Sequence, residues 1–174
     1  MVTANLKDRL QPALLDRLTD DNPQQREEAE DRRVMTKPQL RQAVLRDLGW
    51  LLNAVQPLGK LAEAYPVLAG SVLNFGLPAL SGQLASKVDV SVLEKAIRQT
   101  LIRYEPRILA DTLEVHAIEA NSVLDTHNVI EFEIRGHLWS QPVPLEILLR
   151  TQLDLEAGQV EVRDAVALGA GRAV

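Results

Sequence analysis

The chain has 174 residues, a formal net charge of -5 at pH 7 and a sequence pI of about 5.2. This length suits one domain, or one domain with an arm. The acidic balance argues against a protein that binds nucleic-acid phosphates, because that task needs a basic surface. Only 3% of the residues are aromatic, so a platform for stacking bases is not expected either.

The residue content also excludes some chemistry and predicts where the protein resides. Cysteine is absent, which excludes disulfides, thiolate nucleophiles and cysteine-based zinc sites. The segment from Met1 to Leu10 is polar and charged, so no signal peptide is expected. The longest neutral stretch, residues 65–86, is interrupted by proline and glycine, which is not the pattern of a membrane span. We therefore expect a cytoplasmic protein with no direct membrane insertion.

The N-terminal segment has the pattern of an amphipathic helix, which we call the arm. From Ala4 to Leu18, leucines recur every four residues and charged residues fill the opposite face. The following stretch, residues 19–33, has six acidic and three basic residues and almost no apolar ones, which is typical of a solvated linker. The arm packs either on the protein's own core or on a partner, and the linker slightly favours a partner. The candidate partner-binding leucines are Leu6, Leu10, Leu14 and Leu18.

Two longer helices are expected next. The first has a capping box that starts at Thr36, and its apolar stripe extends to Val55. The second has a capping box that starts at Ser91, and it ends before Pro106, which disfavours helical backbone in the preceding residue. Between the helices, the uncharged stretch of residues 65–82 is expected to pack as a folded connector.

After the second helix, the period of the apolar residues changes from 3.6 to 2. Residues 109–117, 130–138 and 143–155 alternate between apolar and polar, and Val160 and Val162 mark a short fourth strand. Short connections between such strands predict an antiparallel meander with one buried face. The expected fold class is α+β, with N-terminal helices packed on one face of a four-stranded meander. The expected parts are an amphipathic arm helix at 1–18, an acidic linker at 19–35, the α+β domain at 36–163 and a flexible tail at 164–174.

The sequence offers little for catalysis or metal binding. Matching the apolar faces of the first two strands places His116 opposite Glu131 or Glu133, with His137 roughly 13–20 Å away along the ladder. That distance is too long for a shared metal. Glu131 and Glu133 have nearly the spacing of glycosidase carboxylates, but no aromatic sugar platform accompanies them. No nucleophile motif or phosphate-binding loop is present. We expect no metal, no cofactor and no enzymatic activity.

One short charged motif, Glu105-Pro106-Arg107, lies at the predicted junction of helix and sheet. Pro106 disfavours helical backbone at Glu105, so the side chains of Glu105 and Arg107 should point to a common side. The pair is either a local surface ion pair or a partly desolvated pair presented to a partner.

Several segments in chain order resemble the TssE family, baseplate subunits of bacterial type VI secretion systems. That family is part of a wider group of phage baseplate wedge proteins that carry a "lysozyme-like" name. The Glu-Pro-Arg triplet is the family's signature. The other segments are Leu14-Leu15-Asp16-Arg17-Leu18, Arg46-Asp47-Leu48-Gly49-Trp50-Leu51-Leu52-Asn53, Ser71-Val72-Leu73-Asn74-Phe75-Gly76-Leu77-Pro78 and the run from Phe132 to Leu155.

The resemblance implies a structural protein of a contractile, phage tail-like injection machine. Its partners would be the baseplate subunits TssF, TssG and TssK and the sheath subunits TssB and TssC. It would be cytoplasmic, within a baseplate docked at the inner membrane, and would help to nucleate sheath polymerisation. Glu105, Pro106 and Arg107 would then bind a partner.

Edge strands suggest how the sheath could attach. The meander has two edges, one with Val160 and Val162 and one at residues 108–118, and either could receive a sheath strand. Two alternative functions remain open at this point. One is a free-standing adaptor that binds a single protein, and the other is a peptidoglycan glycosidase that uses Glu131 and Glu133.

Overall fold

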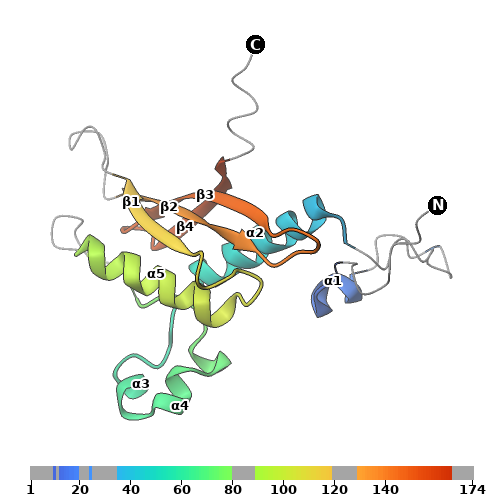
Figure 1. Ribbon diagram of the computed structural model, residues 1–174. Coiled ribbons are helices and arrows are strands. Elements are labelled where there is room, and N and C mark those ends of the chain that lie inside the picture. The colour runs from blue at the N-terminus through green and yellow to red at the C-terminus, as the bar shows by residue number, and fades with distance from the viewer. Residues whose placement is uncertain are drawn as a thin grey trace, which may run out of the picture.

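The computed structural model describes residues 10, 12–19, 24, 35–79, 89–118 and 129–165. Helices come first and a four-stranded antiparallel sheet of order β1-β2-β3-β4 follows, which confirms the expected α+β class (Figure 1). The elements are α1 (Leu14–Leu18), α2 (Lys37–Asn53), α3 (Lys60–Ala64), α4 (Pro66–Ala69), η3 (Val72–Asn74), α5 (Val90–Tyr104), β1 (Glu114–Ile118), β2 (Val129–Leu138), β3 (Leu145–Asp154) and β4 (Gln159–Asp164).

Helix α2 begins with the expected capping box. The Thr36 backbone N–H donates to the Gln39 side chain at 2.8 Å, and the Gln39 backbone N–H donates to the Thr36 hydroxyl at 3.4 Å. The helix ends at Asn53, so the expected extension of its stripe to Val55 is wrong. Val55 instead forms a parallel bridge with Leu77, and its side chain is exposed.

Helix α5 starts one residue before Ser91, the residue expected to cap it. Asp89 is the N-cap, and its carboxylate accepts hydrogen bonds from the Ser91 N–H at 2.9 Å and from the Ser91 hydroxyl at 2.8 Å. These bonds lower the pKa of Asp89. An aspartate at this position satisfies a free N–H of the first turn, which explains the shifted start. The helix ends at Tyr104, before Pro106, as expected.

The register of β1 and β2 agrees with one of the two alignments expected from the sequence. His116 lies opposite Glu133, and Glu114 lies opposite Arg135. Strand β1 begins at Glu114, later than expected, because residues 109–113 form a turn after Ile108 bridges to Leu138. The His137 backbone N–H donates to the Thr112 hydroxyl at 3.0 Å.

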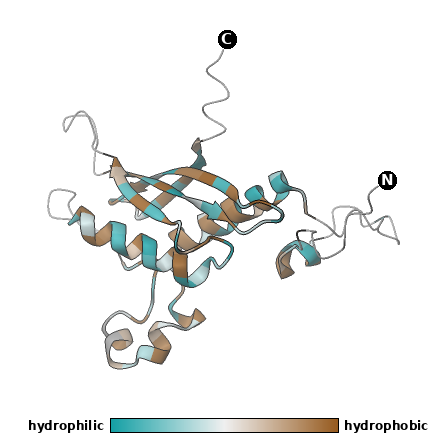
Figure 2. Cartoon of the chain, in the orientation of Figure 1, coloured by the Kyte–Doolittle hydropathy of each residue, from teal (hydrophilic) through white to brown (hydrophobic). Residues whose placement is uncertain are grey.

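The hydrophobic core lies between the sheet and the two long helices. Phe132 and Ile134 of β2 are fully buried, and so are Leu48 of α2 and Leu101 of α5. Helix α2 lies beside β4 and α5 lies beside β1, so each outer strand has a helix next to it. Apolar and polar residues alternate along the long helices and the strands (Figure 2). This arrangement matches the alternating and helical patterns of the sequence.

The connector between α2 and α5 does not pack as expected. Elements α3, α4 and η3 extend from the helical layer on the side opposite the sheet (Figure 1). Several of its large apolar side chains are exposed, among them Val67 and Val72. The absence of charge in this stretch had suggested burial, but the segment contacts the body mainly at its base, through residues such as Asn74 and Phe75.

Candidate functional site

Glu105 and Arg107 form a close pair at the junction of α5 and the sheet. Arg107 Nε lies 2.7 Å from Glu105 Oε1, and Arg107 Nη2 lies 2.5 Å from Glu105 Oε2. The Glu105 carboxylate is only 4% exposed, whereas the Arg107 side chain is 24% exposed. The backbone at Glu105 is not helical, and the two side chains share one side, as the motif predicted. The arrangement is a forked, charge-assisted contact with its cation partly open to solvent.

The sequence did not reveal that this pair belongs to a longer network. Asp47 of α2 accepts a hydrogen bond from Arg107 Nη2 at 2.6 Å and another from Arg46 Nε at 2.9 Å. Arg46 Nη1 in turn donates to Asp16 of α1 at 2.7 Å. We call these five residues the ion network. The sequence signals for these residues were the charged pair Arg46-Asp47 within α2 and the presence of Asp16, Arg46 and Asp47 in the segments that carry the family resemblance.

The acidic residues of the ion network stabilise the charged form of both arginines. Burial lowers the pKa of Arg107, but the hydrogen bonds and charges of Glu105 and Asp47 outweigh this and raise it. The hydrogen bond to Asp16 raises the pKa of Arg46, burial opposes it, and Asp47 adds to the rise. The two guanidinium groups are held in place and are shielded from water on one side. Their solvent-exposed edges can therefore bind an acidic or carbonyl group of a partner.

Two tryptophans lie next to the ion network. The Arg46 guanidinium lies over the Trp50 ring at 5.3 Å from its centroid, and the backbone N–H of Trp139 donates to the backbone carbonyl of Arg107 at 2.7 Å. Both tryptophan side chains are about half exposed. Tryptophan and arginine dominate the energetics of many protein interfaces, so this surface has a composition that suits protein binding.

The arm residues occupy different environments. Leu10 lies in the hydrophobic core, and its carbonyl accepts a hydrogen bond from the Met35 N–H at 2.9 Å. Leu14 and Leu18 of α1 are largely exposed, although Asp16 between them binds Arg46. Leu6 lies outside the described residues, as do most of the linker and residues 166–174 of the tail. Among the described residues of the expected arm helix, only Leu14–Leu18 is helical, because Leu10 pairs with Met35 in a bridge. The described part of the arm therefore contacts the protein's own body and still presents leucines outward.

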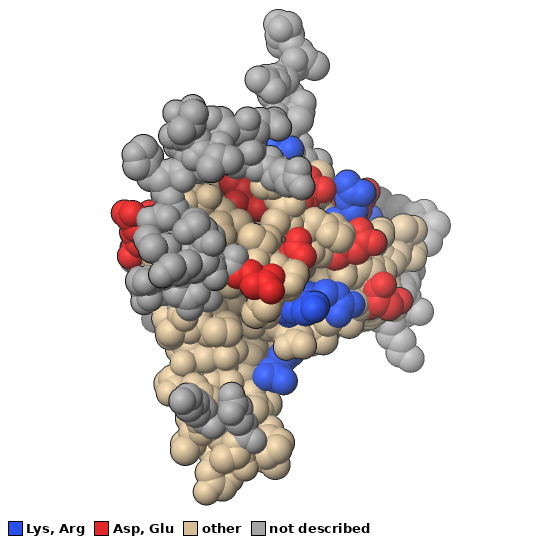
Figure 3. Space-filling view, turned by 90° about the vertical axis from the view of Figure 1, so that its left-hand side faces the viewer, with Lys and Arg blue, Asp and Glu red and all other residues tan. Residues whose placement is uncertain are grey.

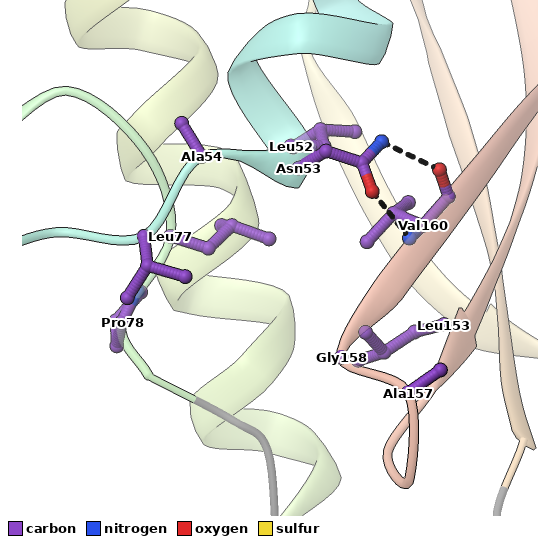
Figure 4. A pocket seen from close by; sticks show the side chains of 10 residues that line it. Leu52, Asn53, Ala54, Leu77, Pro78, Leu153, Ala157, Gly158 and Val160 are labelled. Carbon is purple, nitrogen blue, oxygen red and sulfur yellow. Dashed lines mark hydrogen bonds between the residues drawn. The ribbon is translucent and has the colours of Figure 1, made fainter.

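The sheet edge at β4 is partly occupied by a side chain. Asn53 Oδ1 accepts from the Val160 N–H at 2.9 Å, and Asn53 Nδ2 donates to the Val160 carbonyl at 2.8 Å (Figure 4). The side chains of Val160 and Val162 pack against the core. Beside this contact is a pocket of about 120 Å³ between the end of α2, Leu77 and the turn from β3 to β4. A partner strand that pairs with β4 at Val160 must displace the Asn53 amide.

The edge at β1 is occupied in a similar way by α5. Glu94 accepts a hydrogen bond from the Ala117 N–H at 2.7 Å, and Arg98 Nε donates to the Leu113 carbonyl at 3.1 Å. The sequence did not indicate these contacts, because they join helix side chains to strand backbone. Both edges thus have backbone groups bound by the neighbouring helix, an arrangement that limits edge-to-edge association.

The residues weighed for catalysis are engaged in ordinary surface contacts. Glu131 accepts a hydrogen bond from Gln152 at 2.6 Å, and Glu133 lies 3.5 Å from Arg135. His116 and His137 are on different strands, and His116 lies opposite Glu133. Among the described residues, no group of three or more histidine or acidic side chains could hold a metal ion.

A search of the described residues finds no helix long and apolar enough to cross a membrane. Comparison with known proteins finds no significant match among curated proteins or among solved structures. The family described as baseplate wedge protein gp25 matches residues 38–143, which is more than half of the chain. The match includes Asp47 and the Glu105-Pro106-Arg107 motif. The chain therefore belongs to the gp25 family of baseplate wedge proteins, and its role is that of a structural baseplate component.

Proposed function

We propose that this protein is a TssE-type subunit of a type VI secretion baseplate. In this role it joins the wedge subunits TssF, TssG and TssK to the contractile sheath of TssB and TssC, and it helps to nucleate sheath polymerisation. It acts in the cytoplasm, within a baseplate docked at the inner membrane. Membership of the baseplate wedge family supports this proposal.

The ion network around Arg107 is the observation that carries the proposal. A forked pair between a buried carboxylate and a largely buried arginine holds the guanidinium in one orientation. Asp47 holds the same guanidinium from a second element, so its position does not depend on the short motif alone. A cation fixed in this way loses little side-chain entropy when a partner binds it. Glu105, Pro106 and Arg107 therefore serve as the centre of the wedge interface.

The experiment is a binding measurement between the purified full-length chain and a co-expressed TssF–TssG complex, followed by cross-linking. We expect binding by the wild type and a loss of about tenfold or more for Arg107→Ala. An equally strong complex with Arg107→Ala would contradict the role of the ion network. Recovery of a single unrelated protein in place of TssF and TssG would support the adaptor alternative instead.

Attachment to the sheath is a second part of the proposal. A TssB strand adds either at β4, beside Val160 and Val162, or at β1, and displaces the helix side chains bound there. Proline at Val162 or Ala117 removes an N–H that points away from the neighbouring strand, and neither side chain is fully buried, so each substitution blocks one edge without opening the core. Sheath nucleation should fail with one of the two prolines. Nucleation that survives both would contradict strand addition at these edges.

The enzymatic alternative has a direct test. Glu131 and Glu133 have side-chain partners and lie on the strand faces of the sheet, and the family is structural. Purified protein should not hydrolyse peptidoglycan. Hydrolysis that disappears in Glu131→Gln or Glu133→Gln would replace the structural role by a catalytic one.

A further inference from the structure

An apolar projection extends from the body of the protein. It comprises residues 61–75, which include most of α3 together with α4 and η3, and it lies on the side of the helices opposite the sheet (Figure 1). In the space-filling view, the described side chains of this projection at the bottom of the molecule are uncharged, whereas charged residues gather above it (Figure 3); the side chain of Glu63, within the projection, is not among those described. Neither the ion network nor the sheet edges involve this surface.

Many of the apolar side chains of the projection are exposed to solvent. Val67 is 86% exposed and Val72 is 80% exposed, and Leu61, Tyr65 and Leu73 are each more than half exposed. No acidic or basic residue occurs from Ala64 to Ala79. Contiguous apolar surface of this kind on a folded protein marks an interaction site.

The projection is also held in a defined position. The Tyr104 hydroxyl lies 2.9 Å from the Ser71 carbonyl and 2.8 Å from the Asn74 carbonyl, and Arg103 donates to the Ala69 carbonyl at 2.8 Å. The helices α3 and α4 have five and four residues, which is too short to be stable alone. These anchors on the last turn of α5 therefore present the apolar side chains as a fixed surface rather than as a loose loop.

The chemistry of the projection indicates what covers it. A lipid surface is disfavoured, because the nearby Arg103 is bound to the Ala69 carbonyl and the described part of the projection has no basic cluster. A symmetric contact between two copies would pair the same patch with itself, and two convex projections leave most of their sides uncovered. The described side chains of this protruding surface are uncharged and largely apolar, which fits an uncharged apolar groove on a different protein.

We propose that the apolar projection inserts into an uncharged apolar groove of a neighbouring baseplate wedge subunit. It forms a second contact, separate from the ion network. Because the chain belongs to a baseplate wedge family, a neighbouring wedge subunit is the expected partner. The choice of the TssF–TssG complex as the binding probe rests on the function proposed above.

The test uses full-length variants that place a charge on the projection without harming the fold. Val67 lies in the first turn of α4 and Val72 in the first turn of η3, where an aspartate is compatible with the helix. Val67→Asp and Val72→Asp are therefore expected to unfold in urea at the wild-type midpoint. Val92→Asp is the matched control, since Val92 is an exposed valine in the first turn of α5, at the end of that helix away from the anchors.

We expect Val67→Asp and Val72→Asp each to weaken binding to purified TssF–TssG by about tenfold or more, because a charge would be buried in an apolar groove. Val92→Asp should bind like the wild type. Amide hydrogen exchange of residues 61–75 should slow when the wild-type complex forms.

Other results would overturn the proposal in distinguishable ways. Wild-type affinity in both projection variants would overturn this inference and leave the proposed function intact. A wild-type chain that does not bind TssF–TssG at all would overturn the proposed function and with it this partner. If the wild type binds phosphatidylglycerol vesicles and Val67→Asp does not, lipid is the occupant. If the wild type sediments as a dimer and Val67→Asp as a monomer, a second copy is the occupant.

Discussion

Asp47 accepts a 2.6 Å hydrogen bond from Arg107, a residue 60 positions further along the chain. Through this contact the Glu-Pro-Arg motif is fastened to α2, and through Arg46 it is connected to α1. The charged motif is therefore a part of the tertiary structure and also a surface feature, since Arg107 remains about a quarter exposed. Substitutions in this motif can therefore change both the stability of the fold and the binding of a partner.

The bond between Asp47 and Arg107 should couple the two residues energetically. In a double-mutant cycle of Asp47→Ala and Arg107→Ala, we expect a coupling of about 1–2 kcal/mol in the free energy of unfolding, because both side chains are about three-quarters buried. Urea denaturation of the four proteins measures it. The pair Glu161–Arg163 is the control, since both side chains are more than half exposed and a much smaller coupling is expected. Equal coupling in the two pairs would contradict a special role for Asp47.

Substitutions within the motif should separate stability from assembly. Glu105→Ala should lower the free energy of unfolding by about 3 kcal/mol, since it leaves Arg107 without its main partner, yet the monomer should remain folded. Arg107→Lys should lower stability less but still weaken wedge binding, because an ammonium cannot fork to Glu105 and Asp47 together. Circular dichroism and binding to TssF–TssG measure the two effects. A Glu105→Ala chain that is unfolded in isolation would make the pair a core feature and remove the case for a partner role.

The arm should contribute both to stability and to recruitment. Leu10 lies in the core and Asp16 binds Arg46, so deletion of the residues before Asn22 should lower stability modestly, by about 2 kcal/mol, and leave the domain folded. The same deletion should weaken recruitment to the baseplate, because it removes the exposed leucines of α1. Asp16→Ala alone should make α1 more sensitive to proteolysis. Unchanged recruitment after the deletion would show that the arm serves only the protein's own core.

Substitution of two glycines by alanine should change the stability of the protein in opposite directions. Gly76 has a φ of 120°, and a Cβ there would lie 2.3 Å from the Ala54 carbonyl oxygen, so Gly76→Ala should destabilise by about 3 kcal/mol or more. Gly49 is inside α2 with no atom within 4 Å of a built Cβ, so Gly49→Ala should stabilise by about 0.5–1 kcal/mol. Thermal unfolding of the two variants measures both. Similar shifts in the two would contradict the close approach of Gly76 to the end of α2.

The Asn53 side chain should protect the edge of β4. Asn53→Ala removes the acceptor of the Val160 N–H, so hydrogen exchange at that amide should become faster by about tenfold or more. Gln42→Ala, which removes another exposed amide from α2, is the control and should leave this exchange unchanged. If the Val160 amide is equally protected in both variants, Asn53 does not close the edge.

Local features of the fold could be predicted well from the sequence. The capping box at Thr36 and the end of α5 before Pro106 depend on residues close in the chain. The alternating pattern narrowed the partner of His116 to Glu131 or Glu133, and the structure has Glu133. The start of α5 was misplaced because Asp89 and Ser91 are both good capping residues, and only the backbone path decides between them. The uncharged connector was misread as packed, because composition does not show whether an apolar segment has a surface to cover it.

By itself, the sequence determined the α+β class, the meander and the common side of Glu105 and Arg107, since periodicity and the restriction before proline act over a few residues. Only the tertiary structure decided that Asp16, Arg46 and Asp47 join that pair, and that Asn53 binds the backbone of Val160. These contacts connect segments between 30 and 107 positions apart. Such contacts depend on how helices and sheet dock, and docking is set by the whole core rather than by any local pattern.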